Sequence, residues 1–224
     1  MSETVYKVVE TFVSINGEGR KAGQLAVFVR FAGCNLDCEY CDTKWANKHD
    51  VSYKEMTAVE IYNLIKETSV RNVTLTGGEP LIQKDIEQLL KVLSADESIE
   101  VEIETNGSVD VKTFRNMENP PAFTIDYKLS ASGMEDKMCL RNYETVTEKD
   151  TVKFVSGSVS DLEKCKEIID RYNLTKKTNV YISPVFGKIE PAEIVEFMKE
   201  NNMNNVNLQI QMHKVIWDPD KTGV

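Results

Sequence analysis

The stretch "CNLDCEYC", residues 34–41, places three cysteines in a C-x3-C-x2-C spacing. A structural zinc site normally closes with four Cys or His ligands. A 4Fe–4S cluster usually takes four thiolates, one for each iron. Only three are close together here, so the spacing indicates either a cluster with one open iron, held by Cys34, Cys38 and Cys41, or a Cys3His zinc site completed by His49.

The chain around this stretch has a repeating pattern. Short runs rich in Val, Ile, Thr and aromatic residues alternate with helical patterns, and the starts of the later runs recur every 22 to 29 residues. This is the spacing of βα units, which build a parallel sheet covered by helices, either an open doubly wound sheet or a barrel. The predicted strands are 24–31, 72–76, 100–105, 122–127, 151–155, 179–183 and 205–210.

Helix starts between these strands have recognisable signals. Thr57 with Glu60 and Ser160 with Glu163 have the spacing of a capping box, and Pro191 stands where a first helical turn tolerates proline. Residues 128–150 are less regular, and we expect an excursion from the repeat there.

Composition limits the class of protein. The 224 residues are 41% hydrophobic and 28% charged, which is typical of a globular chain, and we expect one domain over 1–224. The net charge of −9 argues against a nucleic-acid or anionic-membrane partner. We find neither a signal peptide nor an apolar run approaching the roughly 20 residues of a membrane span. Five cysteines, three of them crowded, do not form a disulfide framework, so we expect a reducing compartment, the cytoplasm.

Unusual residues gather where the predicted strands end. "AGCNLDC", "TGGEP", "ETNG", "YKLSASG", "SPVFG" and "QMHK" each follow a predicted strand. In parallel α/β folds the carboxyl edge of the sheet is where ligands bind, so these segments predict one shared site.

The cysteine spacing, with the aromatic Tyr40 before the last cysteine, resembles the signature of the radical S-adenosylmethionine (SAM) superfamily. "TGGEP" resembles its GGE motif, which binds the methionyl ammonium of SAM. The resemblance implies that SAM chelates the open iron and that its cleavage yields a radical that removes a hydrogen atom from substrate. The residues it implies for SAM are Tyr40, Asp42, Gly78, Glu79, Glu104, Asn106, Ser130, Ala131, Ser132, Ser183, Pro184, Val185 and Phe186.

Three further segments are similar to the 7-carboxy-7-deazaguanine synthases. "SINGEGRKAG" is similar to their QGEG-x3-G stretch, with Asn16 where that family commonly has Gln. Arg30 stands four residues before the first cysteine, and Thr43 lies two residues after the last one, as in that family. "LQIQMHK" resembles the LQ-x-HK ending with an inserted pair. The similarity runs from about residue 10 to the C-terminus.

This resemblance implies an incomplete (β/α) barrel of about six units and a homodimer. The implied reaction converts 6-carboxy-5,6,7,8-tetrahydropterin to 7-carboxy-7-deazaguanine with loss of ammonia, a step towards the 7-deazapurine bases of modified tRNA. It needs a reductant such as flavodoxin or ferredoxin, and Mg²⁺ on Thr43. We expect Glu18 to bind the guanidine-like edge and Arg30 the substrate carboxylate. The substrate residues implied are Asn16, Gly17, Glu18, Arg30, Thr76 and His213, with the tail 217–224 as a cover.

Three alternatives remain open from the sequence. A radical SAM activase of a glycyl radical enzyme shares the cluster, but has no reason to keep Glu18, Arg30 and Thr43 as a pterin site. A 4Fe–4S electron carrier would prefer a fourth cysteine. A zinc-stabilised binding module would contain zinc in place of iron.

Overall fold

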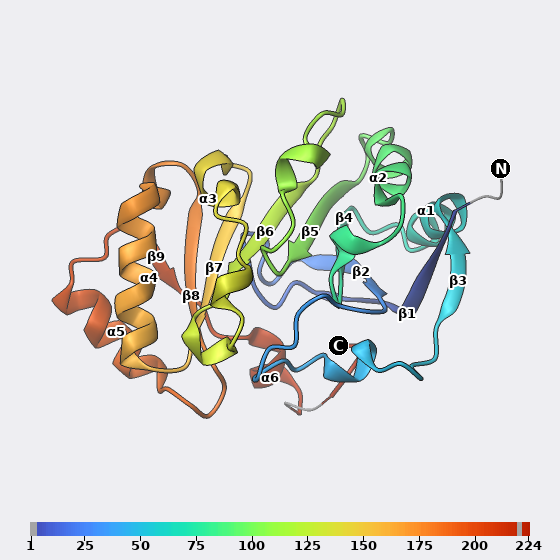
Figure 1. Cartoon of the computed structure of the whole chain (residues 1–224). Coiled ribbons are helices and arrows are strands. Elements are labelled where there is room, and N and C mark those ends of the chain that lie inside the picture. Colours follow the sequence, from blue (N-terminus) through green and yellow to red (C-terminus); the bar gives the residue numbers. More distant parts are fainter. Residues whose placement is uncertain (1–3, 219–220) are drawn as a thin grey trace.

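A computed structural model describes residues 4–218 and 221–224 of the chain. One nine-stranded sheet runs through this part in the order β3-β1-β2-β4-β5-β6-β7-β8-β9 (Figure 1). The strands are β1 (Val5–Ile15), β2 (Leu25–Phe31), β3 (Lys54–Thr57), β4 (Asn72–Gly77), β5 (Glu100–Thr105), β6 (Ala122–Tyr127), β7 (Thr151–Ser156), β8 (Asn179–Pro184) and β9 (Val206–Leu208). The α-helices are α1 (Ala58–Glu67), α2 (Ile86–Ser94), α3 (Arg141–Thr145), α4 (Val159–Tyr172), α5 (Pro191–Glu200) and α6 (Met212–Ile216).

Strand β2 and strands β4 to β9 are all parallel, whereas β1 and β3 run antiparallel at one edge. Seven parallel strands are joined by six crossovers, and β3 and β9 lie at opposite ends of the sheet order without pairing. The expected incomplete (β/α) barrel of about six units is therefore confirmed. All seven predicted strands form, but β1 and β3 were not predicted.

The helices pack against the sheet through apolar side chains. In α2, Leu89, Leu90 and Leu93 are buried, and they belong to the same core as Val73 and Leu75 of β4. Burial of one such side chain contributes about 1.5–3 kcal/mol, so a few residues for each helix hold it on the sheet. The other face of the strands, away from the helices, lines the interior of the incomplete barrel.

The local helix signals are confirmed in two of three cases. Thr57 caps α1 in a complete capping box with Glu60, and Pro191 is the first residue of α5. The prediction that Ser160 caps the next helix is wrong. Helix α4 begins two residues earlier, because Ser158 has extended backbone angles and its Oγ accepts the N–H of Asp161 at 3.2 Å. Between β6 and β7 the irregular segment holds the short helices η4 (Ser130–Ser132), η5 (Glu135–Lys137) and α3.

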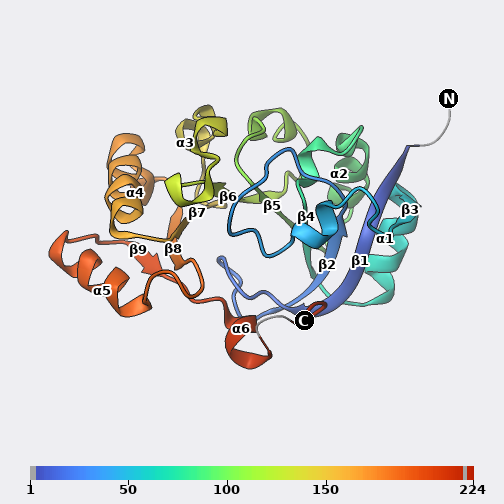
Figure 2. The ribbon, with the colours of Figure 1, turned by 60° about the horizontal axis from the view of Figure 1, so that its bottom comes forward.

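The loops at the carboxyl ends of the parallel strands converge. Figure 2 shows the segment after β2 arching across the neighbouring strands before it enters the short helix η1 (Lys44–Asn47), with the C-terminal residues beside β1. Within the described residues, no helix has both the length and the apolarity that a membrane span requires.

Candidate active site

A cavity of about 1200 Å³ lies at this edge of the sheet. Pockets for one small molecule usually measure roughly 300–1,000 Å³, so this one has room for more than one ligand. The predicted site residues that line it are Gly17, Glu18, Arg30, Cys34, Cys38, Tyr40, Cys41, Asp42, Thr43, Thr76, Gly78, Glu104, Asn106, Pro184, Val185, Phe186 and His213. Those that do not line it are Asn16, Glu79, Ser130, Ala131, Ser132 and Ser183.

The three clustered cysteines all face this cavity, whereas Cys139 and Cys165 do not. The sulfur of Cys34 accepts hydrogen bonds from the backbone N–H of Leu36 at 3.4 Å and from Nδ2 of Asn106 at 3.5 Å. Hydrogen bonds to thiolate sulfur are one way in which proteins tune iron–sulfur clusters. Three cavity-lining thiols with N–H donors beside one of them therefore fit a three-cysteine cluster site.

The zinc alternative does not fit this geometry. His49, its fourth ligand, is exposed and does not line the cavity. In residues 4–218 and 221–224, no group of three or more His, Cys, Asp or Glu side chains is placed to hold a single metal ion.

The glycines of "TGGEP" lie where two backbones meet. A Cβ on Gly78 would lie 1.8 Å from the carbonyl oxygen of Gly33, and one on Gly77, whose φ is +133°, would lie 2.3 Å from that of Phe31. Only glycine permits this approach between the end of β4 and the cysteine loop. Both glycines line the cavity, so their backbone forms a cradle that a ligand ammonium could reach.

Glu79 lies in the wall behind this cradle, with none of its surface exposed. Its carboxylate accepts hydrogen bonds from Leu81 N at 3.0 Å, Thr105 Oγ1 at 2.9 Å and Asn106 N at 2.7 Å. Burial raises the pKa of Glu79 to about 7, although these hydrogen bonds act in the opposite direction. Glu79 thus ties the loop after β4 to the loop after β5.

The end of β5 adds acceptors to the cavity. Thr76 Oγ1 donates a hydrogen bond of 2.7 Å to Glu104 Oε2, and burial raises the pKa of Glu104. Asn106 Nδ2 donates to Asn35 Oδ1 at 2.9 Å, which connects this loop to the cysteine loop.

The "LSAS" segment lies in a supporting position. Ser130 Oγ donates to Asp161 Oδ1 at 2.7 Å, and the carbonyl oxygen of buried Ser132 accepts the N–H of Glu39 at 3.1 Å. The hydroxyl of Ser132 donates to the carbonyl oxygen of Leu129 at 2.6 Å, and neither serine lines the cavity. Tyr40 does line it, and its hydroxyl donates to the carbonyl oxygen of Val155 at 3.4 Å.

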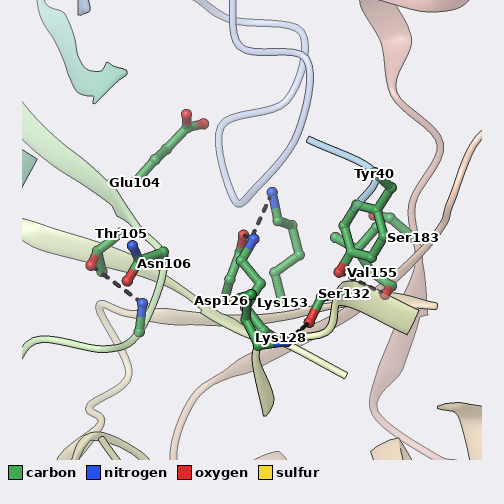
Figure 3. Close-up of polar contacts among 12 residues, drawn as sticks. Tyr40, Glu104, Thr105, Asn106, Asp126, Lys128, Ser132, Lys153, Val155 and Ser183 are labelled. Carbon is green, nitrogen blue, oxygen red and sulfur yellow. Dashed lines mark hydrogen bonds and ion pairs between the residues drawn. The ribbon is translucent and has the colours of Figure 1, made fainter. Parts of the chain in front are cut away.

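Two charged residues of the interior, Asp126 and Lys153, were missed by sequence reasoning, whereas Lys128 belongs to the "YKLSASG" segment that was expected at the site. Asp126 from β6, Lys128 just after it, and Lys153 from β7 converge in the cavity wall (Figure 3). Asp126 lies 2.6 Å from Lys128 Nζ and 3.3 Å from Lys153 Nζ. A charged residue inside an otherwise apolar β-run was the available signal, since such a side chain is seldom buried without a partner.

This ion network includes Glu18. Lys153 Nζ lies 3.3 Å from Glu18 Oε2, and Ser183 Oγ donates to Glu18 Oε1 at 3.1 Å. Burial alone would lower the pKa of Lys153, but Asp126, Glu18 and Glu104 outweigh it and raise that pKa well above its usual value. Lys153 therefore stays protonated between the carboxylates.

Other predicted substrate residues have separate partners. Arg30 Nε lies 2.7 Å from Glu10 Oε1. A Cβ on Gly17 would lie 2.7 Å from His213 Nδ1, so these two residues are in close contact, and burial lowers the pKa of His213. Asn16 is buried in the wall, where its Oδ1 accepts from Thr74 Oγ1 at 2.9 Å.

Thr43 and the C-terminal residues also line the cavity. Thr43 Oγ1 donates to Asp42 Oδ1 at 3.0 Å, and Lys214 Nζ lies 3.8 Å from Asp42 Oδ2. Residues 221–224 line the cavity. Residues 219–220 of the expected tail lie outside the described residues.

The comparisons with known proteins agree with this geometry. The radical SAM superfamily model matches residues 28–129, which include the cysteine loop and "TGGEP". A crystal structure of QueE from Escherichia coli matches 93% of this chain and 95% of its own with a TM-score of 0.71, at 23% sequence identity, which shows a shared fold.

Curated relatives match over nearly the whole chain. The 7-carboxy-7-deazaguanine synthase of Clostridium acetobutylicum is 61% identical over 98% of this chain and 99% of its own length. The enzyme of the same name from Chlorobaculum tepidum is 34% identical over 100% of this chain and 99% of its own. This chain therefore belongs to the 7-carboxy-7-deazaguanine synthase family of radical SAM enzymes.

Proposed function

We propose that the chain makes 7-carboxy-7-deazaguanine from 6-carboxy-5,6,7,8-tetrahydropterin, with ring contraction and loss of ammonia. The observation that carries the proposal is that one cavity joins three cysteine thiols to Arg30 and Glu18. Arg30 suits a carboxylate and Glu18 suits a guanidine-like edge, so the cavity has the polar groups that this bicyclic acid requires.

Radical SAM enzymes use a 4Fe–4S cluster and SAM, and we assign Cys34, Cys38 and Cys41 as the cluster ligands. When bound, the cluster and SAM supply the radical chemistry that removes a hydrogen atom from the substrate. The chain's own task is to hold both ligands, to orient the substrate and to exclude water.

The SAM part of the cavity would be formed by backbone and apolar groups. Gly78 would offer its backbone to the ammonium, and Asn106 lines the same cavity with its Nδ2 donating to the sulfur of Cys34. Tyr40 and residues 184–186 provide the surface opposite. Glu79, Ser130, Ser132 and Ser183 support these groups from behind, because their side chains bond to other parts of the chain.

The substrate part would use side chains in fixed positions. Glu18 is held on both oxygens, by Lys153 and Ser183, so its carboxylate does not need to reorganise when a guanidine-like group binds. Thr76 and His213 offer hydrogen-bonding groups nearby. Asn16 supports Gly17 and Glu18 from the wall through its bond to the strand behind it.

A divalent ion belongs to the proposal as well. An oxygen from Thr43, the substrate carboxylate and water would form the all-oxygen shell that Mg²⁺ prefers. Its main task would be to hold the carboxylate in the cavity, close to the tail residues 221–224, which would help to cover the bound substrate.

We further propose that one domain carries the whole site, since a single sheet extends from Val5 to Leu208. The functional unit would be a homodimer supplied by a flavodoxin- or ferredoxin-type reductant. A cytoplasmic location would suit cluster ligands that must stay reduced.

The test is an anaerobic turnover assay. The reconstituted protein is incubated with SAM, reductant, Mg²⁺ and the carboxytetrahydropterin, and both 7-carboxy-7-deazaguanine and 5′-deoxyadenosine are measured by mass spectrometry. We expect both products. A preparation that cleaves SAM and forms no deazaguanine would show that the proposed substrate is wrong.

A further inference from the structure

The pair Glu10–Arg30 is built into the cavity wall by an irregularity of β1. Strand β1 pairs Val8 with Phe31, but the register then shifts and Glu10 lies opposite Arg30. Val8 is buried in the core, 3% exposed, whereas Glu10 faces the cavity although it stands only two residues further on. A regular strand would point both residues to the same side, so the β-bulge redirects Glu10.

An aromatic pair lies two residues further along the same face of the two strands. Phe12 lies opposite Phe28, and their rings stack with centroids 4.9 Å apart and planes 7° apart. Both rings line the cavity on the same face as Glu10 and Arg30. On the other side, a side chain at position 223 would lie 4.0 Å from Glu10 Oε2. Glu10 thus lies between Arg30 and the tail.

The contact between the two charges uses only part of the guanidinium. Glu10 Oε1 accepts from Nε of Arg30 at 2.7 Å, and within the described residues Nη1 and Nη2 have no hydrogen-bond partner. A guanidinium is a planar fork with five N–H donors, and a bond at Nε fixes the plane while leaving the two terminal nitrogens available for a second carboxylate. The side chain of Arg30 lines the cavity and is only 17% exposed.

We infer that Glu10 is a positioning residue for substrate: it holds the guanidinium of Arg30 so that Nη1 and Nη2 bind the carboxylate of the pterin end-on. This inference rests on the proposed function and adds to it a residue that the motifs did not indicate. Glu10 does not touch substrate. It acts through Arg30, and it repels a second carboxylate from the Nε side, so the substrate has one orientation.

The experiment measures dissociation constants for two ligands on the cluster-loaded, SAM-bound enzyme under anaerobic conditions. One ligand is the carboxytetrahydropterin and the other is tetrahydropterin without the 6-carboxylate. Glu10→Ala should raise the dissociation constant of the carboxylated ligand about tenfold or more, which is the effect of losing one charge-assisted contact. The dissociation constant of the other ligand should change by less than about twofold. Glu10→Gln, which keeps an acceptor for Nε, should show a smaller loss.

A double-mutant cycle with Arg30→Lys separates positioning from general damage. Because Lys lacks the planar fork, Glu10→Ala should cost almost nothing further in the Arg30→Lys background. Glu55→Gln, a surface carboxylate on β3 that does not line the cavity, is the matched control and should change neither constant. Thermal unfolding midpoints verify that each variant is folded.

Three results would overturn the inference alone: equal losses for both ligands, additive effects of the two substitutions, or no loss for either ligand. If the wild-type enzyme binds both ligands equally well and makes no deazaguanine, then both the inference and the proposed function are wrong. A wild-type enzyme that makes the product and a Glu10→Ala variant that binds both ligands normally would remove only Glu10 from the site.

Discussion

Lys153 Nζ lies 3.3 Å from Glu18 Oε2 across 135 residues of sequence, and the same ammonium lies 3.3 Å from Asp126 Oδ1. One buried cation therefore separates two carboxylates in the wall of the cavity, and it sets the position of the residue that we assign to the guanidine-like edge of the substrate.

Replacing Lys153 with Met should damage both stability and substrate binding. The change leaves Glu18 without a cation, whereas Asp126 keeps Lys128 at 2.6 Å. Breaking a buried pair in this way costs about 3–5 kcal/mol of unfolding free energy. We expect KM for the pterin to rise at least tenfold, with Lys153→Arg recovering part of the loss. Lys166→Met removes a surface pair on α4 and should change the unfolding free energy by less than about 1 kcal/mol. Denaturant titration and steady-state kinetics measure the two effects, and equal costs for the two lysines would contradict this account.

The cysteines should differ sharply in iron binding. We expect most iron and sulfide to be lost after anaerobic reconstitution of Cys34→Ser, Cys38→Ser or Cys41→Ser. The reason is that, among the residues that the structure describes, the cavity has only these three thiolates to hold the cluster, so each one is needed. Cys139→Ser changes a half-buried thiol outside the cavity and should keep the wild-type content. Iron and labile sulfide for each chain are the measurements. Retained iron in Cys38→Ser would remove that residue from the ligand set.

Gly78→Ala should weaken SAM binding in a protein that still folds. Its Cβ would meet the carbonyl oxygen of Gly33 at 1.8 Å, so the cysteine loop must move away from the end of β4. We expect the dissociation constant for SAM, measured by equilibrium dialysis, to rise at least tenfold, which is a loss of about 1.4 kcal/mol of binding free energy. Gly23→Ala is the control, since its φ of +83° strains the backbone while its nearest neighbour is 3.9 Å away. That control should lose about 1 kcal/mol of stability and no SAM affinity.

His213 should make stability fall in mild acid. Burial depresses its folded-state pKa below the ordinary value of about 6.5, so the unfolded chain binds a proton more readily than the folded chain does. This contribution to the unfolding free energy is complete above pH 6.5 and is lost as the pH falls from there through the folded pKa. The difference in unfolding free energy between wild type and His213→Gln should therefore shrink over that window. A difference that stays constant from pH 7.5 to 5 would show that His213 keeps its ordinary pKa.

Thr43 should control the response to magnesium. Thr43→Val keeps the shape of the side chain but removes the oxygen, so the Mg²⁺ concentration for half-maximal turnover should rise about tenfold, whereas Thr43→Ser should stay near wild type. Turnover is measured in chelator-treated enzyme over a Mg²⁺ titration. If the Val variant responds like wild type, the ion binds elsewhere in the cavity.

Local pattern was sufficient for much of the fold. The seven parallel strands, the Thr57 cap and Pro191 could be predicted because each depends on residues within a few positions of one another. Strand β1 was missed for the opposite reason. Its alternation is interrupted at the register shift before Glu10, so no single period describes it, and its place between β2 and β3 depends on pairing with both strands.

The sequence by itself determined the chemistry of the site, because the three-cysteine spacing, the paired glycines and the flanking Arg30 and Thr43 all lie in short stretches whose meaning is local. Only the tertiary structure decided which groups face each other. It pairs Arg30 with Glu10 and Glu18 with Lys153, and it places Glu79 behind the wall. The physical reason is that a buried charge needs a partner, and that partner lies on whichever segment the fold brings beside it. Glu10 is 20 residues from Arg30 on the neighbouring strand, and Lys153 is 135 residues from Glu18, so spacing along the sequence does not reveal either pair.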